Sequence, residues 1–270
     1  MKLFQVVAMG LVVSSVMGAR AEDAKLKPER PPVQSTGGVV GVKDAGSIKG
    51  VVRFTGEKPA PKPIADIAGN AFCKECYKDA PLPNEDKLVF GKNGDGNALA
   101  NVLVYVSKGL EGKKIEIPKE PVVIDQIGCV YVPHVVAVMA GQTLEVRNAD
   151  ATLHNVMAAP RKNVPFNFGM AGGAEPVNRV FKEPEFKVNL KCFMHPWMSG
   201  YVHVLPHPYF AVSGPDGAFA IQGLPAGEYE LTALHETSAV EAKPATVTVK
   251  VTAGATAGAD FTFSMKAKKE

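Results

Sequence analysis

The chain has 270 residues, of which 46% are hydrophobic and 21% charged, and its formal net charge is +3 at pH 7. The first 21 residues contain Lys2 and Arg20 and no acidic residue, so the rest of the chain has 28 basic against 27 acidic residues. The chain is nearly neutral and has no dense Lys and Arg cluster beside aromatic residues. It therefore gives no reason to expect nucleic acid or a membrane surface as a partner.

Residues 1–21 have the features of a secretory signal peptide. Lys2 gives a positive start, residues 3–18 form an apolar run, and Ala19-Arg20-Ala21 is a small-x-small cleavage site. The run is too short and too poorly flanked for a transmembrane helix, and no Cys follows it as a lipoprotein anchor would require. We expect an exported protein without membrane insertion, most simply a bacterial periplasmic one. An extracellular location and an uncleaved membrane anchor are the alternatives.

The remaining chain shows strand patterns rather than helical periodicity. Residues 22–46 are rich in Lys, Pro, Gly and Ser and are expected to form a flexible lead-in. After them, short β-branched and aromatic runs alternate with Gly and Pro turn signals. Strands are predicted, in chain order, at 50–54, 102–106, 134–139, 144–147, 186–192 and 202–204. The pattern predicts an all-β protein made of sandwiches or barrels.

The C-terminal part has its own strand and turn pattern. Pro215-Asp216-Gly217 and Pro225-Ala226-Gly227 are predicted turns, in which Pro fixes φ and Gly permits a positive φ. Val247, Val249 and Val251 then alternate with polar residues, as in a half-buried strand. The basic residues at 266–270 are expected to form a solvated tail.

This C-terminal part resembles a carboxypeptidase regulatory-like domain, which is a small transthyretin-like β-sandwich. The resemblance is carried by residues 216–219 and 223–229, and the usual opening of such a domain is matched at 50–54 and 100–104. It implies one sandwich in two parts, 47–118 and 207–265, with residues 119–206 inserted between them at a loop. Two separate β domains in tandem are the simpler alternative.

Cys192, His195 and Met198 place a thiolate, an imidazole and a thioether within seven residues, and His154 offers a second imidazole upstream. Two His, one Cys and one Met form the ligand set of a blue-copper site, with a trigonal His-His-Cys plane and a weak axial Met.

Strand parity supports an inward direction for the thiolate. Phe186, Val188, Leu190 and Cys192 share one strand face, and because the first three are apolar this face is expected to point to the core. Pro196 opposes strand pairing, so the loop is expected to fold His195 and Met198 back over Cys192.

The other polar residues near the motif have simpler expected roles. Asn155 is expected to bond the backbone of the Cys192 loop and tie the two ligand segments together. His134 is expected to be structural. His203, His207 and His235 are expected to lie at the surface, with His203 on the opposite strand face to its two valine neighbours.

Three cysteines remain when Cys192 is assigned to the metal. One disulfide is expected among them in an exported chain. Cys129 is expected to pair with Cys73 or Cys76, and a local Cys73–Cys76 bridge is an equal alternative. A haem attachment motif is excluded because Tyr77 stands where it would need His.

Residues 121–206 resemble a cupredoxin of the amicyanin type. The matching residues are Cys192-x-x-His195-Pro196-x-Met198-x-Gly200 and His154-Asn155-Val156 after Asn148. The resemblance implies one type 1 copper ion, with His154, Cys192 and His195 as equatorial ligands and Met198 as the axial ligand. It also implies a cupredoxin Greek-key sandwich and a periplasmic one-electron carrier. A redox protein partner would dock on an apolar surface over His195, formed by Pro196, Trp197 and Met157.

Two other functions remain as alternatives. The chain could be a periplasmic or cell-surface binding or scaffold module, or a copper carrier, with the same fold. A copper enzyme would need a second metal site with an open position, and the remaining His residues lack the spacing for one. No acid/base pair or nucleophilic triad stands out, so we expect a protein that is not an enzyme.

Overall fold

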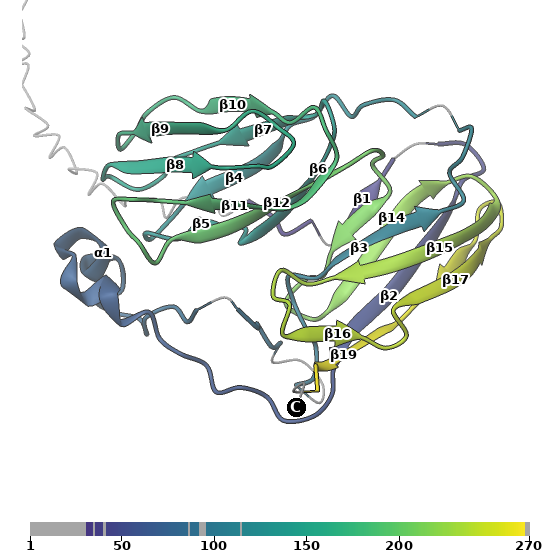
Figure 1. Cartoon of the computed structure of the whole chain (residues 1–270), viewed down its shortest axis with the longest axis horizontal. Helices are drawn as coiled ribbons and strands as arrows, with labels where there is room; N and C mark the ends of the chain where they lie inside the picture. Colours follow the sequence, from purple (N-terminus) through teal and green to yellow (C-terminus); the bar gives the residue numbers. More distant parts are fainter. Residues whose placement is uncertain are drawn as a thin grey trace, which may run out of the picture.

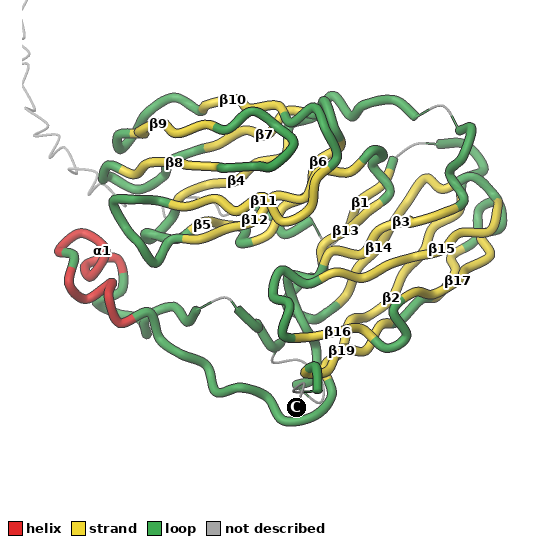
Figure 2. The backbone as a smooth tube through the Cα atoms, viewed as in Figure 1, coloured by secondary structure: helices red, strands yellow, loops and turns green. Residues whose placement is uncertain are grey.

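The computed structural model describes residues 31–34, 36–39, 42–85, 87–91, 96–113 and 115–267. Nearly all of the regular secondary structure within these residues is strand, which confirms the all-β class (Figures 1 and 2). Two short helices, η1 (Ala65–Gly69) and α1 (Ala71–Cys76), were not predicted. The predicted signal peptide, the start of the predicted lead-in and the end of the predicted basic tail lie outside the described residues. No helix among the described residues is long and apolar enough to span a bilayer.

One pair of sheets, called here the outer sandwich, combines strands from both ends of the chain. Its first sheet has the order β1-β14-β2-β19-β16, with β18 also paired to β2, and its second has the order β13-β3-β15-β17. The first comprises β1 (Thr36–Gly38), β2 (Gly46–Phe54), β14 (Ala218–Leu224), β16 (Val240–Ala242), β18 (Thr256–Gly258) and β19 (Phe261–Met265). The second comprises β3 (Leu103–Lys108), β13 (Phe210–Val212), β15 (Gly227–Leu234) and β17 (Thr246–Val251). The two inner faces share one core, which includes Val52, Val104 and Leu231.

The middle of the chain forms a second pair of sheets, called here the central sandwich. Its sheets have the orders β10-β7-β4-β5 and β6-β12-β11-β8-β9. The first comprises β4 (Val122–Gln126), β5 (Tyr131–Val132), β7 (Thr143–Val146) and β10 (Val177–Val180). The second comprises β6 (Val135–Met139), β8 (His154–Ala158), β9 (Phe166–Met170), β11 (Glu185–Lys191) and β12 (Ser199–Leu205). The core between them contains Ile124, Leu144, Val156 and Leu190, together with Cys192 and Met198 of the ligand motif.

The two sandwiches pack against each other through a small apolar cluster. Leu103, Phe210 and Val212 of the outer sandwich meet Val135, Ala137 and Leu205 of the central one. The amide side chain of Gln34 makes two hydrogen bonds to the backbone of Ala137, as a neighbouring strand would. It donates to Ala137 O at 3.0 Å and accepts from Ala137 N at 2.6 Å. This contact covers the far face of β6 and β12.

Three predictions about histidines are wrong. His203 is fully buried, and His207 and His235 are 8% and 2% exposed, whereas all three were expected at the surface. Alternation along β12 does place His203 opposite Val202 and Val204, but the second sandwich, rather than solvent, lies on that side. The alternation of side chains along a strand shows on which face of the sheet a residue lies, but it does not show whether solvent or another sheet covers that face.

The predicted inward face of β11 is confirmed for Val188, Leu190 and Cys192, which are at most 2% exposed. Phe186 is the exception at 39% exposed. The pairing of β11 with β12 shifts register between Glu185 and Val188, and Lys187 has a positive φ of 60°. Such a bulge reverses the alternation before it, so Phe186 faces outward.

The predicted turn at Gly217 is confirmed, since its φ is +72° and a Cβ there would lie 2.4 Å from Val52 O. Gly227 was expected to have a positive φ as well, but it begins β15 and has none; Gly223 has φ +74° instead.

Candidate metal centre

Three segments of the central sandwich bring the predicted ligands together. His154 is the first residue of β8, Cys192 follows the last residue of β11, and His195 and Met198 lie in the loop that leads into β12. His154, Cys192, His195 and Met198 are all buried, with exposures of 0–3%. The structure therefore gathers the four predicted side chains at one end of the sandwich, within its core.

The ligand atoms of the two imidazoles and the thiol converge. The Nδ1 atoms of His154 and His195 are 2.9 Å apart, and Cys192 Sγ is 3.8 Å from His195 Nδ1. One nitrogen of each ring and the sulfur all lie within 4.8 Å of one another, as ligands around one ion do. Met198 N donates to His195 O at 2.9 Å, a tight turn after which the Met198 side chain lies in the same buried core as Cys192.

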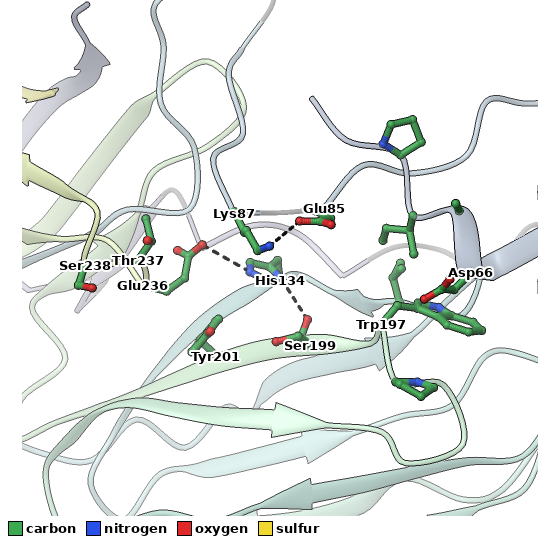
Figure 3. A pocket seen from close by; sticks show the side chains of 15 residues that line it. Asp66, Glu85, Lys87, His134, Trp197, Ser199, Tyr201, Glu236, Thr237 and Ser238 are labelled. Carbon is green, nitrogen blue, oxygen red and sulfur yellow. Dashed lines mark hydrogen bonds and ion pairs between the residues drawn. The ribbon is translucent and has the colours of Figure 1, made fainter. Parts of the chain in front are cut away.

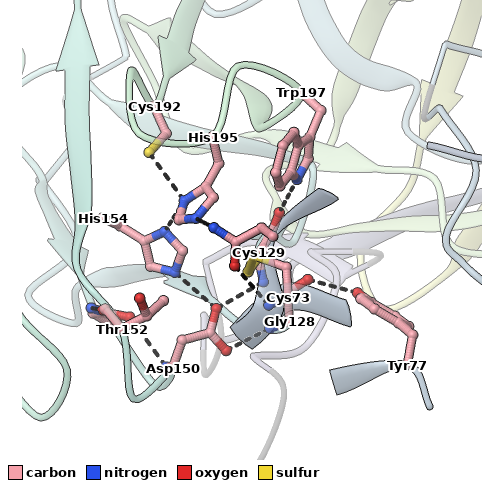
Figure 4. The surroundings of a disulfide bond; sticks show 12 residues. Cys73, Tyr77, Gly128, Cys129, Asp150, Thr152, His154, Cys192, His195 and Trp197 are labelled. Atoms are coloured by element: carbon pink, nitrogen blue, oxygen red, sulfur yellow. Dashed lines mark hydrogen bonds and ion pairs between the residues drawn. A yellow bond between two sulfur atoms is a disulfide. The ribbon is translucent and has the colours of Figure 1, made fainter. Parts of the chain in front are cut away.

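The outer nitrogen of each imidazole has a partner of its own. Asp150 Oδ2 is 2.9 Å from His154 Nε2 (Figure 4). Asn70 Nδ2 is 3.3 Å from His195 Nε2. The carboxylate can only accept, so His154 carries its proton on Nε2 and presents the Nδ1 lone pair to the centre. An amide N–H can only donate, so in the neutral ring His195 Nε2 accepts and Nδ1 holds the proton. A metal bound to both Nδ1 atoms would therefore displace the proton on His195 Nδ1, and a neutral His195 would then carry its proton on Nε2, beside Asn70.

The surroundings of Cys192 favour the ionised form of its thiol. Burial alone would raise the pKa of Cys192, but the hydrogen bond with His154 and the N–H groups of Asn155, His195 and Met194 bring it below its usual range. Burial opposes charge on His154, while Asp150 and the Cys192 sulfur raise its pKa overall. Burial and the neighbouring His154 lower the pKa of His195. These directions favour a thiolate beside a protonated His154, and a soft cation bound to both residues would replace that ring proton.

Asn155 ties the two ligand segments together, as predicted. Its side-chain oxygen accepts from Phe193 N, directly after Cys192, and its own backbone N–H points at Cys192 Sγ at 3.4 Å. An N–H group aimed at a ligand sulfur withdraws electron density from it, so this contact would tune a bound metal.

A disulfide-bonded cover lies over His195, and the sequence did not reveal it. Cys73 of α1 is bonded to Cys129, which confirms one of the predicted pairings and leaves Cys76 as an exposed free thiol. One imidazole nitrogen of His195 and the two disulfide sulfurs lie within 4.8 Å of one another. Because this cover and Asn70 lie over the ring, His195 is only 3% exposed, and the expected apolar surface directly over its imidazole is not open.

Asp150 connects the cover to the ligands. Besides His154, its carboxylate accepts from Gly128 N at 2.6 Å and from Cys129 N at 2.8 Å. On the other side, Trp197 Nε1 donates to Cys129 O at 3.0 Å and the indole lies 5.2 Å from the His195 ring, centroid to centroid. The loop at 128–129 is thus bound to both ligand segments. Sequence reasoning missed Asp150 and Asn70, although Asp150 precedes His154 by four residues.

Comparisons with known proteins give weak similarity. No family model and no curated protein matches the chain. Among solved structures, it is similar to amicyanin from Paracoccus versutus at 23% identity and TM-score 0.29, over 37% of this chain and 96% of that one. It is similar to a purple cupredoxin from Nitrosopumilus maritimus at 22% identity and TM-score 0.27, over 31% of this chain and 98% of that one.

A copper-containing nitrite reductase from Thermus scotoductus is similar at 20% identity and TM-score 0.30, over 36% of this chain. The chain spans only 25% of that reductase. Similarity at this level carries no weight for function, so the assignment of a metal and a role depends on the side chains described above.

Proposed function

We propose that the chain is an exported type 1 copper protein that carries single electrons, with His154, Cys192 and His195 as equatorial ligands and Met198 as the axial one. The observation that carries this proposal is the convergence of two Nδ1 atoms and one Sγ within 4.8 Å in a buried pocket. The donor set selects the metal, since His2Cys sites with a thioether beside them favour copper over zinc or iron.

The residues present fit such an ion. Asp150 holds the outer nitrogen of His154, so the Nδ1 atom of that ring is available as a ligand. The Nδ1 atom of His195 would become available once its proton is lost. The thiolate is favoured by its surroundings. Bound copper would supply a one-electron couple, and the protein would hold its ligands in a fixed arrangement through the Asp150 and Asn155 hydrogen bonds.

Burial of the whole ligand set argues for a carrier rather than an enzyme. All four proposed ligands are at most 3% exposed, so a substrate has no open coordination position to reach. An electron needs no such access. A redox protein partner would approach the ligand loop where Pro196 is exposed and Trp197 half-buried, with the indole between the partner and His195. The apolar residues of the signal peptide support a periplasmic location.

The visible spectrum of the protein titrated with Cu(II) tests the proposal. One equivalent should produce an intense thiolate-to-copper charge-transfer band. Cys192→Ser should abolish the band, whereas Cys76→Ser, which removes the exposed free thiol, should keep it. A band that survives Cys192→Ser would remove this sulfur from the site.

The alternative role as a copper carrier is distinguished by voltammetry and exchange. An electron carrier should give a reversible one-electron wave and hold its copper against a chelator. Rapid loss of copper to the chelator, without a reversible wave, would instead support copper transport.

A further inference from the structure

A second pocket lies beside the metal centre, between the two sandwiches (Figure 3). Its volume is about 720 Å³, within the size range of pockets that bind small molecules. Pro196 and Trp197 of the ligand loop line one end, and Glu236, Thr237 and Ser238 of the outer sandwich line the other. The pocket is therefore long, with its two ends contributed by different sandwiches.

Glu236 is the unusual residue of this pocket. Its side chain is only 4% exposed, and neither carboxylate oxygen has a hydrogen bond among the described residues. The nearest groups are imidazoles, with His235 Nδ1 at 3.1 Å and His134 Nε2 at 3.7 Å. His235 Nδ1 already accepts a hydrogen bond from Thr237 N. A buried carboxylate without donors is costly, so this group calls for a ligand that brings N–H or O–H donors.

The charge of the lining selects among such ligands. Asp66, Glu85 and Glu236 face one formal cation, Lys87, and that lysine is paired with Glu85 at 2.6 Å. Lys187 is close enough for the Glu236 charge to raise its pKa, against a larger lowering by burial, but it makes no ion pair with that carboxylate among the described residues. With His134 and His235 neutral, the lining has more carboxylates than cations, so an anion is repelled and a cation is favoured over a neutral molecule.

The rest of the pocket lining suits a ligand with a large apolar part. Trp197 and Tyr201 line the pocket (Figure 3). Pro63 and Ile64 line it as well. Indole and phenol rings offer flat apolar area and attract cations to their faces. The hydroxyl groups of Ser199 and Thr237 give further polar contacts.

We infer that this pocket binds an arylalkyl ammonium ion, with the ammonium group at Glu236 and the aromatic body against Tyr201 and Trp197. The three N–H donors of a primary ammonium supply what the buried carboxylate lacks. This site is separate from the proposed copper ligands, so it can be tested without copper.

The test compares three isosteric probes on the full-length, copper-free protein. They are 2-phenylethylammonium, 2-phenylethanol and 3-phenylpropanoate, and binding is measured by calorimetry and by the fluorescence of Trp197, the only Trp in the chain. The ammonium ion should bind at least tenfold more tightly than the alcohol, and the propanoate should not bind. If the alcohol binds as tightly as the ammonium ion, or if the ammonium ion does not bind, the inference is wrong.

Two substitutions sharpen the result. Glu236→Gln should remove the preference for the cation, whereas Glu228→Gln, an exposed residue of β15, should leave it unchanged. A preference that survives Glu236→Gln would place the recognition elsewhere. The probe series on the unmodified chain decides the question even if Glu236→Gln does not fold. The copper spectrum is not part of this test, so failure here and failure of the proposed copper site are distinguishable.

Discussion

Removal of the Cys73–Cys129 disulfide should strongly destabilise the region around the metal centre. The bond joins residues 56 positions apart, and closing a loop of that length reduces the entropy of the unfolded chain by an amount worth about 4 kcal/mol. Both cysteines are fully buried, so the double variant Cys73→Ala/Cys129→Ala also loses packing around His195. We therefore expect a loss of about 4 kcal/mol in the free energy of unfolding.

Urea unfolding of the copper-free protein, followed by Trp197 fluorescence, measures this loss. The indole reports on the relevant region because it donates to Cys129 O and packs on His195. Cys76→Ala is the matched control, since this exposed thiol is free, and its effect should stay within about 0.5 kcal/mol. A loss below about 1 kcal/mol in the double variant would show that the disulfide does not hold the cover in place.

Two further predictions concern single residues. Asp150→Asn should weaken copper binding about 10- to 100-fold, because an amide cannot accept all three hydrogen bonds that the carboxylate takes from His154, Gly128 and Cys129. Competition with a chelator measures the copper affinity, and Asp260→Asn at the surface is the control. An unchanged copper affinity would contradict the role of Asp150. Burial, with the Lys187 and His235 charges, lowers the pKa of His203 to about 3. Between about pH 3 and about pH 6.5, His203 is protonated in the unfolded chain and neutral in the folded one, so the free energy of unfolding falls as the pH falls. His203→Phe should make the decrease in unfolding free energy between pH 7 and pH 4 smaller, and an equal decrease in both proteins would refute this reasoning.

The residues proposed as ligands could be recognised because their signals are local. Cys192, His195 and Met198 share one loop, and the period of two along β11 shows which way the thiol points. The upstream imidazole of His154 completes a donor set with a well-defined chemical preference. The strands that were predicted and the turn at Gly217 followed from the same short-range patterns, with exceptions at the Lys187 bulge and at Gly227, whereas β4, β8, β9 and β10 were not predicted.

The cover and the contact between the sandwiches could not be predicted in this way. Asn70 and Asp150 act through long-range pairing, and a lone Asn or Asp carries no sign of its partner. The number of cysteines limited the possible disulfide pairings to a few but did not identify which one forms. The burial of His203 depends on what packs on the far side of β12, which periodicity does not encode.

X-ray absorption at the copper edge of the loaded protein tests the central claim most directly. With one copper per chain, the account predicts one short copper–sulfur bond and two copper–nitrogen bonds, and loss of the short sulfur contribution in Cys192→Ser. A first shell of nitrogen and oxygen only, or a sulfur contribution that persists in Cys192→Ser, would contradict it.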